Sequence, residues 1–283
     1  MSRTTASLVC YKTSLTELEP LLRSLREDPS IDTWVVVDNA AAEDPTQAER
    51  LRELTHHYGG IYVAPIANIG FGAGHNAALE ALRNVPSAFH LIVNPDIVFG
   101  RDVLPALTAV MDAQPRVGLI MPRVFYPDGT TQYLCRLLPT PLDSILRRFA
   151  PGVLQRLAQR SMDRYELREM DCEQSAQIPF LAGCFMFTRR SVLESVGGFD
   201  ERYFLYLEDV DLCRRLSTVS ELLYWPAVSI VHTQERGSHK NFKLMLTHTR
   251  SAILYFNKWG WFFDADRTRI NNTALAQLPR KKS

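Results

Sequence analysis

Short apolar runs alternate with stretches of helical periodicity over residues 1–125, and this alternation restricts the fold more than any other feature of the chain. The apolar runs predict a buried strand at residues 7–11 and further strands at residues 34–37, 61–63 and 90–93. The stretches between them predict helices at residues 15–26, 45–58 and 75–83. Strands that alternate with helices of about 10–15 residues are typical of parallel sheets covered by helices on both faces. The sequence therefore predicts an α/β fold with a mostly parallel sheet.

Polar residues come after three of these predicted strands. Asp38 directly follows the second strand, the stretch NIGFGAGHN (residues 68–76) comes after the third, and Asn94-Pro95-Asp96 follows the fourth. The carboxyl ends of parallel strands meet at one edge of a sheet, and ligands bind outside that edge. We therefore expect the three polar clusters to lie together at a binding edge.

Composition narrows the classes of protein that the chain can belong to. The 32 Lys and Arg residues nearly balance the 31 Asp and Glu residues, which excludes a nucleic-acid binder held by bulk charge. The hydrophobic content of 46% excludes a disordered chain. No run approaches the roughly 18 apolar residues of a membrane span, and the five scattered cysteines form no CxxC pair. We expect a soluble cytoplasmic protein with no nucleic-acid partner.

The Asn94-Pro95-Asp96 stretch has two interpretations. An aspartate at a rigid strand end can hold Mg²⁺ or Mn²⁺ against a diphosphate, because these cations take hard oxygen ligands and complete their shell with phosphate oxygens. An Asn-Pro sequence is also an ordinary turn, and for this stretch alone the turn is the more frequent outcome.

Gly70, Gly72 and Gly74 precede a predicted helix start. Glycines let a ligand approach the backbone closely, and a helix N-terminus presents free N–H groups to an anion. The G-x-G-x-G spacing differs from the dinucleotide pattern G-x-G-x-x-G, and the chain has no P-loop sequence. A nucleotide loop of another kind and a glycine-capped helix start without a ligand both remain open.

Glu208, Asp209 and Asp211 open a predicted helix over residues 208–216. Acidic residues in a first turn favour the positive end of the helix dipole, which would by itself explain their presence. One carboxylate aimed into a pocket could instead act as a general base. His232 follows an apolar strand, where a hydrogen-bonded structural histidine is more frequent than a metal ligand.

Residues 136–170 carry seven Arg against four acids, interleaved with apolar residues. This pattern indicates either a basic amphipathic surface that touches a membrane or an anionic acceptor, or a helix pair whose apolar stripe packs on the core. The residues after Asp266 include five basic side chains and no acid, so we expect a solvated tail.

The order and spacing of these motifs resemble glycosyltransferase family 2, and within it the bacterial rhamnosyltransferase-like branch. The resembling stretches are VVVDNA (35–40), NIGFGAGHN (68–76), NPD (94–96), the stretch 183–216 and VHTQERGS (231–238). The resemblance implies a GT-A fold in a single domain over residues 1–258. Residues up to about 125 would form its nucleotide-binding half and residues 126–258 its acceptor half, followed by a basic tail over 259–283.

The resemblance also implies roles for individual residues. Asp209 matches the general base, with Glu208 and Asp211 in support. Asp96 and His232 match positions that hold a metal, here Mg²⁺ or Mn²⁺. The residues that match the nucleotide site are Tyr11, Asp38, Asn68, Gly70, Asn76 and Asn94.

The implied reaction moves a sugar from a nucleoside diphosphate to a hydroxyl, with inversion at the anomeric carbon. We expect L-rhamnose from dTDP-rhamnose as the donor, and as the acceptor a glycan or lipid-diphosphate-linked glycan of cell-surface polysaccharide synthesis. Such an acceptor would bring the protein to the inner face of the plasma membrane. Lys12 and residues 41–44 depart from the family pattern on the nucleotide side, so a UDP-hexose donor is the alternative. A sugar-nucleotide-binding module without catalysis is a further interpretation.

Overall fold

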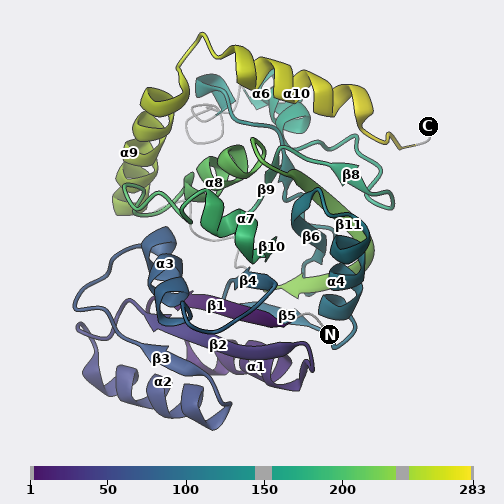
Figure 1. Cartoon of the computed structure of the whole chain (residues 1–283). Helices are drawn as coiled ribbons and strands as arrows, with labels where there is room; N and C mark the ends of the chain where they lie inside the picture. Colours follow the sequence, from purple (N-terminus) through teal and green to yellow (C-terminus); the bar gives the residue numbers. More distant parts are fainter. Residues whose placement is uncertain (1–2, 144–154, 234–241, 282–283) are drawn as a thin grey trace.

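The computed structural model describes residues 3–143, 155–233 and 242–281, and Figure 1 shows their arrangement. The strands are β1 (Thr4–Cys10), β2 (Ile31–Asp38), β3 (Ile61–Val63), β4 (Phe89–Val93), β5 (Ile97–Phe99), β6 (Val117–Phe125), β7 (Cys135–Arg136), β8 (Ala176–Gln177), β9 (Phe180–Leu181), β10 (Phe185–Arg189) and β11 (Glu221–His232). The helices are α1 (Leu15–Glu27), α2 (Pro45–His57), α3 (Phe71–Ala81), α4 (Val103–Ala113), α6 (Gln155–Tyr165), α7 (Arg190–Ser195), α8 (Glu208–Leu216), α9 (Phe242–Trp259) and α10 (Ala265–Gln277).

One sheet runs through the molecule in the order β3-β2-β1-β4-β10-β6-β11-β5, with β8 paired to β11. The first four strands in this order are parallel, and helices α1, α2 and α3 lie around them (Figure 1). Each of the four predicted strands forms, although β1 and β2 begin three residues earlier than expected. Because Cys10 pairs with Asp38, strands β1 and β2 end together and direct their following residues to the same edge.

Helix α3 begins at Phe71, four residues before the predicted start at His75. The glycines of its first turn are sites of close packing rather than a separate loop. A Cβ at Gly72 would lie 2.9 Å from the Cβ of Phe199, and a Cβ at Gly74 would lie 2.7 Å from a methyl of Val9. The missing side chains therefore let the helix approach the strand and the loop beneath it.

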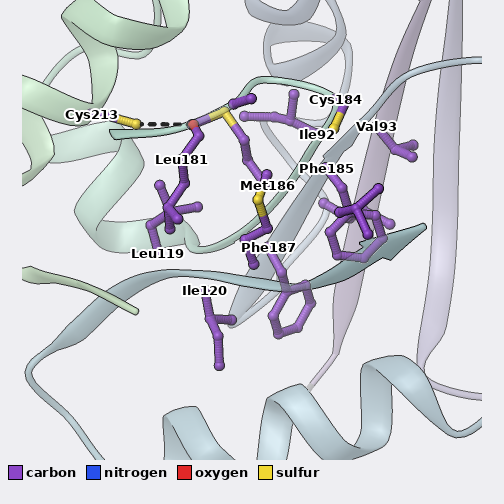
Figure 2. Close-up of a cluster of buried hydrophobic side chains, with 14 of the residues drawn as sticks. Ile92, Val93, Leu119, Ile120, Leu181, Cys184, Phe185, Met186, Phe187 and Cys213 are labelled. Atoms are coloured by element: carbon purple, nitrogen blue, oxygen red, sulfur yellow. Dashed lines mark hydrogen bonds between the residues drawn. The ribbon is translucent and has the colours of Figure 1, made fainter. Parts of the chain in front are cut away.

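The second half of the chain contributes a strand to the middle of this sheet. Strand β10 is antiparallel to both β4 and β6, with Phe185 opposite Val93. Figure 2 shows the apolar cluster around this strand, including Phe187 and the hydrogen bond from the Cys213 thiol to the carbonyl of Leu181 at 3.4 Å. The insertion brings the residues just before β10 against the end of β4, where the metal motif begins.

The expectation of a solvated tail after Asp266 is wrong. Residues 265–277 form helix α10. The side-chain amide of Asn271 accepts the N–H of Leu138 and donates to the carbonyl of Leu138, at 2.9 Å each. Just before the helix, Asp264 accepts two hydrogen bonds from Arg214 at 2.6 and 2.7 Å. The two parallel, charge-assisted hydrogen bonds between Arg214 and Asp264 are of the strong kind, and they hold the C-terminal segment against α8.

The basic segment 136–170 lies partly outside the described residues, since 144–154 are not placed. In its described part the apolar side chains of Tyr165, Leu167 and Met170 are buried in the core. Arg168 stacks on the ring of Tyr133 at 4.2 Å. These contacts pack residues 165–170 on the core. The apolar residues between 145 and 157 that alternate with the arginines lie outside the described side chains, and Leu142 before them is exposed, so both interpretations of the segment stand. Within the described residues, no helix is both long and apolar enough to span a bilayer.

Candidate active site

Asp96 and His232 meet at the edge of the sheet although 136 positions separate them in the sequence. Asp96 follows the end of β4, and His232 ends β11. The two are joined at 3.3 Å between a carboxylate oxygen of Asp96 and Nε2 of His232. Thr233, the residue after His232, also binds the backbone of Asp96. Its N–H and its hydroxyl both donate to the carbonyl of Asp96, at 3.0 and 2.9 Å.

Gln132 determines which ring nitrogen of His232 carries the proton. The Gln132 side-chain amide donates to the carbonyl of His232 at 2.8 Å, so its oxygen must be the atom that faces the Nδ1 of the ring at 2.9 Å. Nδ1 therefore carries the proton, and in the neutral ring Nε2 is a bare acceptor. Nε2 is buried without a hydrogen-bond partner, next to a carboxylate. Two facing acceptors fit a cation, and metal-binding histidines characteristically donate their second ring N–H in this way.

The pair supplies two ligands, and the rest of a metal shell would come from elsewhere. In the part that the structure describes, no cluster of three or more His, Cys, Asp or Glu could hold a metal. Mg²⁺ and Mn²⁺ commonly bind through one or two protein side chains plus substrate phosphates. Asp96 and His232 therefore fit a divalent cation that binds together with a diphosphate.

Replacing Gln132 with leucine should weaken Mn²⁺ binding by about 10–100-fold, because the outer partner that orients the His232 ring would be lost. Isothermal titration with Mn²⁺ and a nucleoside diphosphate measures this effect. Gln47→Leu, which changes a half-buried glutamine at the start of α2, is the matched control. Unchanged Mn²⁺ affinity in the Gln132 variant would show that His232 is not a ligand.

Asp209 lies near the start of α8 and faces the segment that precedes β10. Its Oδ2 accepts the N–H of Gly183 at 3.0 Å, and its Oδ1 accepts the N–H of Val210 at 2.9 Å. A Cβ at Gly183 would lie 3.0 Å from the Cβ of Asp209, so the close approach needs glycine. The backbone carbonyl of the next residue, Cys184, accepts the N–H of Asn94 at 2.8 Å. Residues 183 and 184 thus connect Asp209 to the start of the metal motif.

The carboxylates of Asp96 and Asp209 both lie close enough to Cys184 to affect the pKa of its thiol. Burial raises the pKa of this thiol, and the two carboxylates raise it further. The Asp96 and Asp209 carboxylates therefore both lie near residues 183–184, where Gly183 donates to Asp209 and the Cys184 carbonyl accepts the N–H of Asn94.

Backbone strain precedes Asp209. Tyr206 and Leu207 both have positive φ, 72° and 63°, which is costly for side chains of this size. The ring of Tyr206 packs 5.4 Å from the ring of His248 on α9, which helps to hold this turn. The turn directs α8 so that Asp209 lines a cavity of about 120 Å³, together with Arg136 and others. Such a cavity is where an acceptor hydroxyl could approach the carboxylate.

Glu208 is buried next to Asp209, and its Oε2 has no hydrogen-bond partner. Burial, with a further contribution from the neighbouring Asp209 carboxylate, raises the pKa of Glu208 well above its ordinary value. The neutral form of Glu208 is therefore favoured beside the Asp209 carboxylate. This arrangement suits Asp209 as the proton acceptor and Glu208 as its neutral neighbour.

Glu208→Gln should change the dependence of stability on pH. A buried acid whose folded pKa is raised stabilises the protein fully below its unfolded pKa, and that stability is lost as pH rises towards the folded pKa. Glutamine is neutral at every pH, so the variant should lose less stability than the wild type above about pH 5. Urea unfolding across this pH range measures the difference. Parallel pH curves for the two proteins would show that Glu208 is already ionised.

Asp211 lies on another side of α8 from the cavity residues. It binds Arg215 at 2.8 Å, Lys258 at 2.7 Å and the indole N–H of Trp259 at 2.8 Å. Lys258 also binds Asp200. The structure therefore gives Asp211 contacts that tie α8 to the end of α9, and no contact that would support Asp209 is described for it.

Asp38 ends β2 at the edge where the nucleotide residues were expected. It is buried, and its two oxygens accept the N–H of Ala40 at 2.9 Å and the hydroxyl of Tyr62 at 2.8 Å. Burial and the Asp38 carboxylate raise the pKa of Tyr62, so this hydroxyl stays a donor. Tyr11 follows β1 at the same edge with an exposed ring, and its hydroxyl points to Glu43 at 3.3 Å. An exposed aromatic ring beside a strand end can stack on a nucleotide base.

Asn68 and Gly70 form the turn that starts α3. Asn68 accepts the N–H of Gly70 at 3.0 Å, and Asn39 donates to the carbonyl of Gly70 at 2.9 Å. Gly70 has φ +90°, and a Cβ there would lie 2.3 Å from the carbonyl oxygen of Phe204, so only glycine fits. The glycine turn therefore packs directly on the loop that leads to Asp209, and the two halves of the site are one packed unit.

Asn76 has a different environment from the one expected for a nucleotide ligand. Its amide donates to the carbonyl of Phe199 and to Glu201, both at 2.9 Å, and its oxygen accepts the N–H of Phe199 at 2.9 Å. These bonds occupy the side chain and tie α3 to the loop after α7. The structure therefore places Asn76 where it connects protein segments.

Sequence reasoning missed several residues of the site. Gln132 lies in a stretch with no motif, and only the fold brings it to His232. Arg136 was counted as part of a basic segment, but it lines the Asp209 cavity. Its guanidinium also lies near the ring of Phe180 at 5.9 Å. His248 reaches the same cavity from α9, which no local pattern could have indicated.

Comparisons with known proteins identify the family of the chain. A model of the family described as "Glycosyltransferase like family 2" matches residues 4–253. The chain is 27% identical to the N-acetylglucosaminyl-diphospho-decaprenol L-rhamnosyltransferase of Mycobacterium tuberculosis, over 81% of this chain and 76% of that protein. It is also 27% identical to the rhamnosyltransferase WbbL of Escherichia coli, over 84% of this chain and 87% of that protein.

Solved structures share the fold at lower sequence identity. The mannosyltransferase PcManGT of Pyrobaculum calidifontis, solved with GDP-Man and Mn²⁺, aligns with a TM-score of 0.55 at 18% identity, over 97% of this chain and 74% of that chain. TarS of S. aureus aligns with a TM-score of 0.58 at 15% identity, over 96% of this chain and 43% of that chain. The expected GT-A fold is therefore confirmed. This chain belongs to glycosyltransferase family 2, in its rhamnosyltransferase-like branch.

Proposed function

We propose that the protein transfers L-rhamnose from dTDP-L-rhamnose to a hydroxyl of a lipid-diphosphate-linked glycan, in a metal-dependent reaction with inversion. The observation that carries the proposal is that residues 183–184 bring Asp209 and the Asp96–His232 pair into one site. The names of the two rhamnosyltransferase relatives support the sugar, and the decaprenol-linked substrate of the mycobacterial relative supports the acceptor class.

The residues of the site suit a single displacement. Asp209 would take the proton of the acceptor hydroxyl, and the N–H groups of Gly183 and Val210 would hold the carboxylate in place for that transfer. Neutral Glu208 would leave the negative charge on Asp209. A divalent cation bound at Asp96 and His232 would stabilise the charge that develops on the departing diphosphate. A base and a leaving group on opposite sides of the sugar give inversion, whereas retention would need a carboxylate nucleophile.

Calorimetry with dTDP, UDP and GDP, each with and without Mn²⁺, tests the donor site. We expect Mn²⁺-dependent binding of dTDP, followed by transfer of rhamnose from dTDP-rhamnose to a short-chain lipid-diphosphate N-acetylglucosamine. Preferred binding of UDP would replace rhamnose with a UDP-hexose donor. Binding of none of the three by folded protein would contradict the transferase and leave a binding module.

The proposed acceptor implies where in the cell the protein acts. A lipid-linked diphosphate sugar lies at a membrane surface, and nucleotide sugars are made in the cytoplasm. We therefore propose that the protein works on the cytoplasmic side of the plasma membrane, in the synthesis of a cell-surface polysaccharide.

A further inference from the structure

Helix α9 and the turn after it expose an unusual amount of apolar surface. Of the fourteen large hydrophobic side chains that the described residues expose, six fall between residues 242 and 263, and they are Phe242, Leu246, Ile253, Trp261, Phe262 and Phe263. Phe262 is 80% exposed and Phe263 is 99% exposed. Soluble monomers rarely gather exposed apolar side chains in this way unless the patch binds something.

Three of these side chains lie on helix α9, and the other three lie in the turn directly after it. Phe242, Leu246 and Ile253 are four and seven positions apart, so they share one face of α9. Trp261 extends that face past the end of the helix, because its ring packs 5.2 Å from Phe256 and its N–H donates to Asn257 at 2.8 Å. Figure 1 places α9 and the turn to α10 along the outer edge of the molecule. We call this surface the α9 stripe, meaning the six exposed apolar residues named above.

Within residues 242–263 all the Lys, Arg, Asp and Glu side chains have one sign of charge. Residues 242–263 contain no Asp or Glu, and they contain Lys243, Arg250 and Lys258. Lys258 binds Asp200 and Asp211, and Lys243 and Arg250 are exposed on α9 beside the stripe. Arg250 also lines a cavity of about 260 Å³ with Arg202 and Phe204. Aromatic side chains at a helix end, flanked by basic residues, match the interface of a bilayer that contains anionic lipid.

The opposite face of α9 borders the catalytic cavity. His248 lines the cavity with Asp209, and Ser251 donates to the carbonyl of Leu205 in the loop before α8 at 2.8 Å. One helix, about 10 Å in diameter, therefore separates the stripe from the site. From this geometry we propose that the α9 stripe seats the protein on the surface of an anionic bilayer. If the proposed function holds, this contact would let a lipid-linked acceptor reach Asp209 without leaving the membrane.

Vesicle flotation tests the proposal without any assay of transfer. The wild-type protein should float with phosphatidylcholine vesicles that contain phosphatidylglycerol, and much less with phosphatidylcholine alone. Phe262→Ser combined with Phe263→Ser should lower the partition coefficient by at least about tenfold, since each buried phenylalanine contributes strongly to transfer out of water. Lys243→Glu combined with Arg250→Glu should lower it by a similar factor, and this loss should shrink at high salt.

The matched control is Ile66→Ser, because Ile66 is 97% exposed but lies outside the stripe. It should leave flotation unchanged, and circular dichroism would show that every variant is folded. Failure of the wild-type protein to float, or equal flotation of the phenylalanine variant, would overturn the proposal. A dimer in sedimentation that becomes a monomer in the phenylalanine variant would also overturn it, because a second copy of the chain would then cover the stripe. Flotation without dTDP binding would separate this proposal from the proposed function.

Discussion

Asp209→Asn should lower turnover by ~10²-fold or more while leaving donor binding nearly unchanged. Asparagine cannot take the proton of the acceptor hydroxyl at neutral pH. Its side-chain oxygen can still accept the N–H of Gly183, which lies 3.0 Å from the Asp209 carboxylate, so the turn before α8 should persist. Steady-state transfer rates and calorimetric titration with the nucleoside diphosphate measure the two effects separately.

The control for this variant is Asp102→Asn, which changes an exposed aspartate at the start of α4. Its transfer rate should match that of the wild type. Glu208→Gln is informative beside it, because a residue that is already neutral should tolerate the change far better than Asp209 does. Full activity of the Asp209 variant would remove this residue from the role of base. A loss of donor binding equal to the loss of turnover would show that it positions the donor instead.

Asp96→Asn should abolish the Mn²⁺ dependence of nucleotide binding and lower turnover by about 10²-fold or more, since a bound metal is worth several kcal/mol in stabilising a departing diphosphate. Asparagine keeps the size of the side chain but removes the charge that faces His232 at 3.3 Å. The main-chain contacts from Thr233 go to the Asp96 carbonyl, so they do not depend on the side chain. Titration of the nucleoside diphosphate at several Mn²⁺ concentrations measures the effect.

Asp112→Asn, an exposed change on α4, is the control and should bind nucleotide and metal as the wild type does. A chelator added to the wild type should reproduce the Asp96 defect and should have little further effect on the Asp96 variant. If the Asp96 variant keeps the same response to Mn²⁺, the metal lies elsewhere or is not used. That result would leave Asp209 in its role and change only the account of the leaving group.

The local patterns of the sequence were sufficient for much of the framework. Helix α8 has the predicted bounds, and the four early strands lie within the structure's strands or extend them by one residue at most on the carboxyl side. The composition of β1, of the second half of β2 and of β4 is apolar enough to decide their burial, whereas β3 lies at the edge of the sheet and is exposed or half-buried. The start of α3 was mispredicted because glycines in a sequence indicate a loop, whereas here they permit contact with Phe199 and Val9. That contact involves residues far away along the chain.

In the candidate site, too, the sequence identified some residues, and only the structure showed how others contact them. The sequence singled out Asp96, Asp209 and His232, because each follows or begins an element that a local pattern predicts. It could not show that Gln132 holds the ring of His232, nor that Asp211 binds Lys258 and Trp259. Both facts depend on which segments meet in space.

The sequence by itself determined the elements that alternate along the first half, the polar residues at their ends and the acidic start of α8, because spacing and composition act over a few residues. Only the tertiary structure decided that β10 enters between β4 and β6 and brings Gly183 to Asp209. It also decided that α10 packs on the core instead of extending into solvent. The physical reason is that these outcomes depend on burial and hydrogen bonds between residues distant in the sequence, for which no local pattern carries a signal.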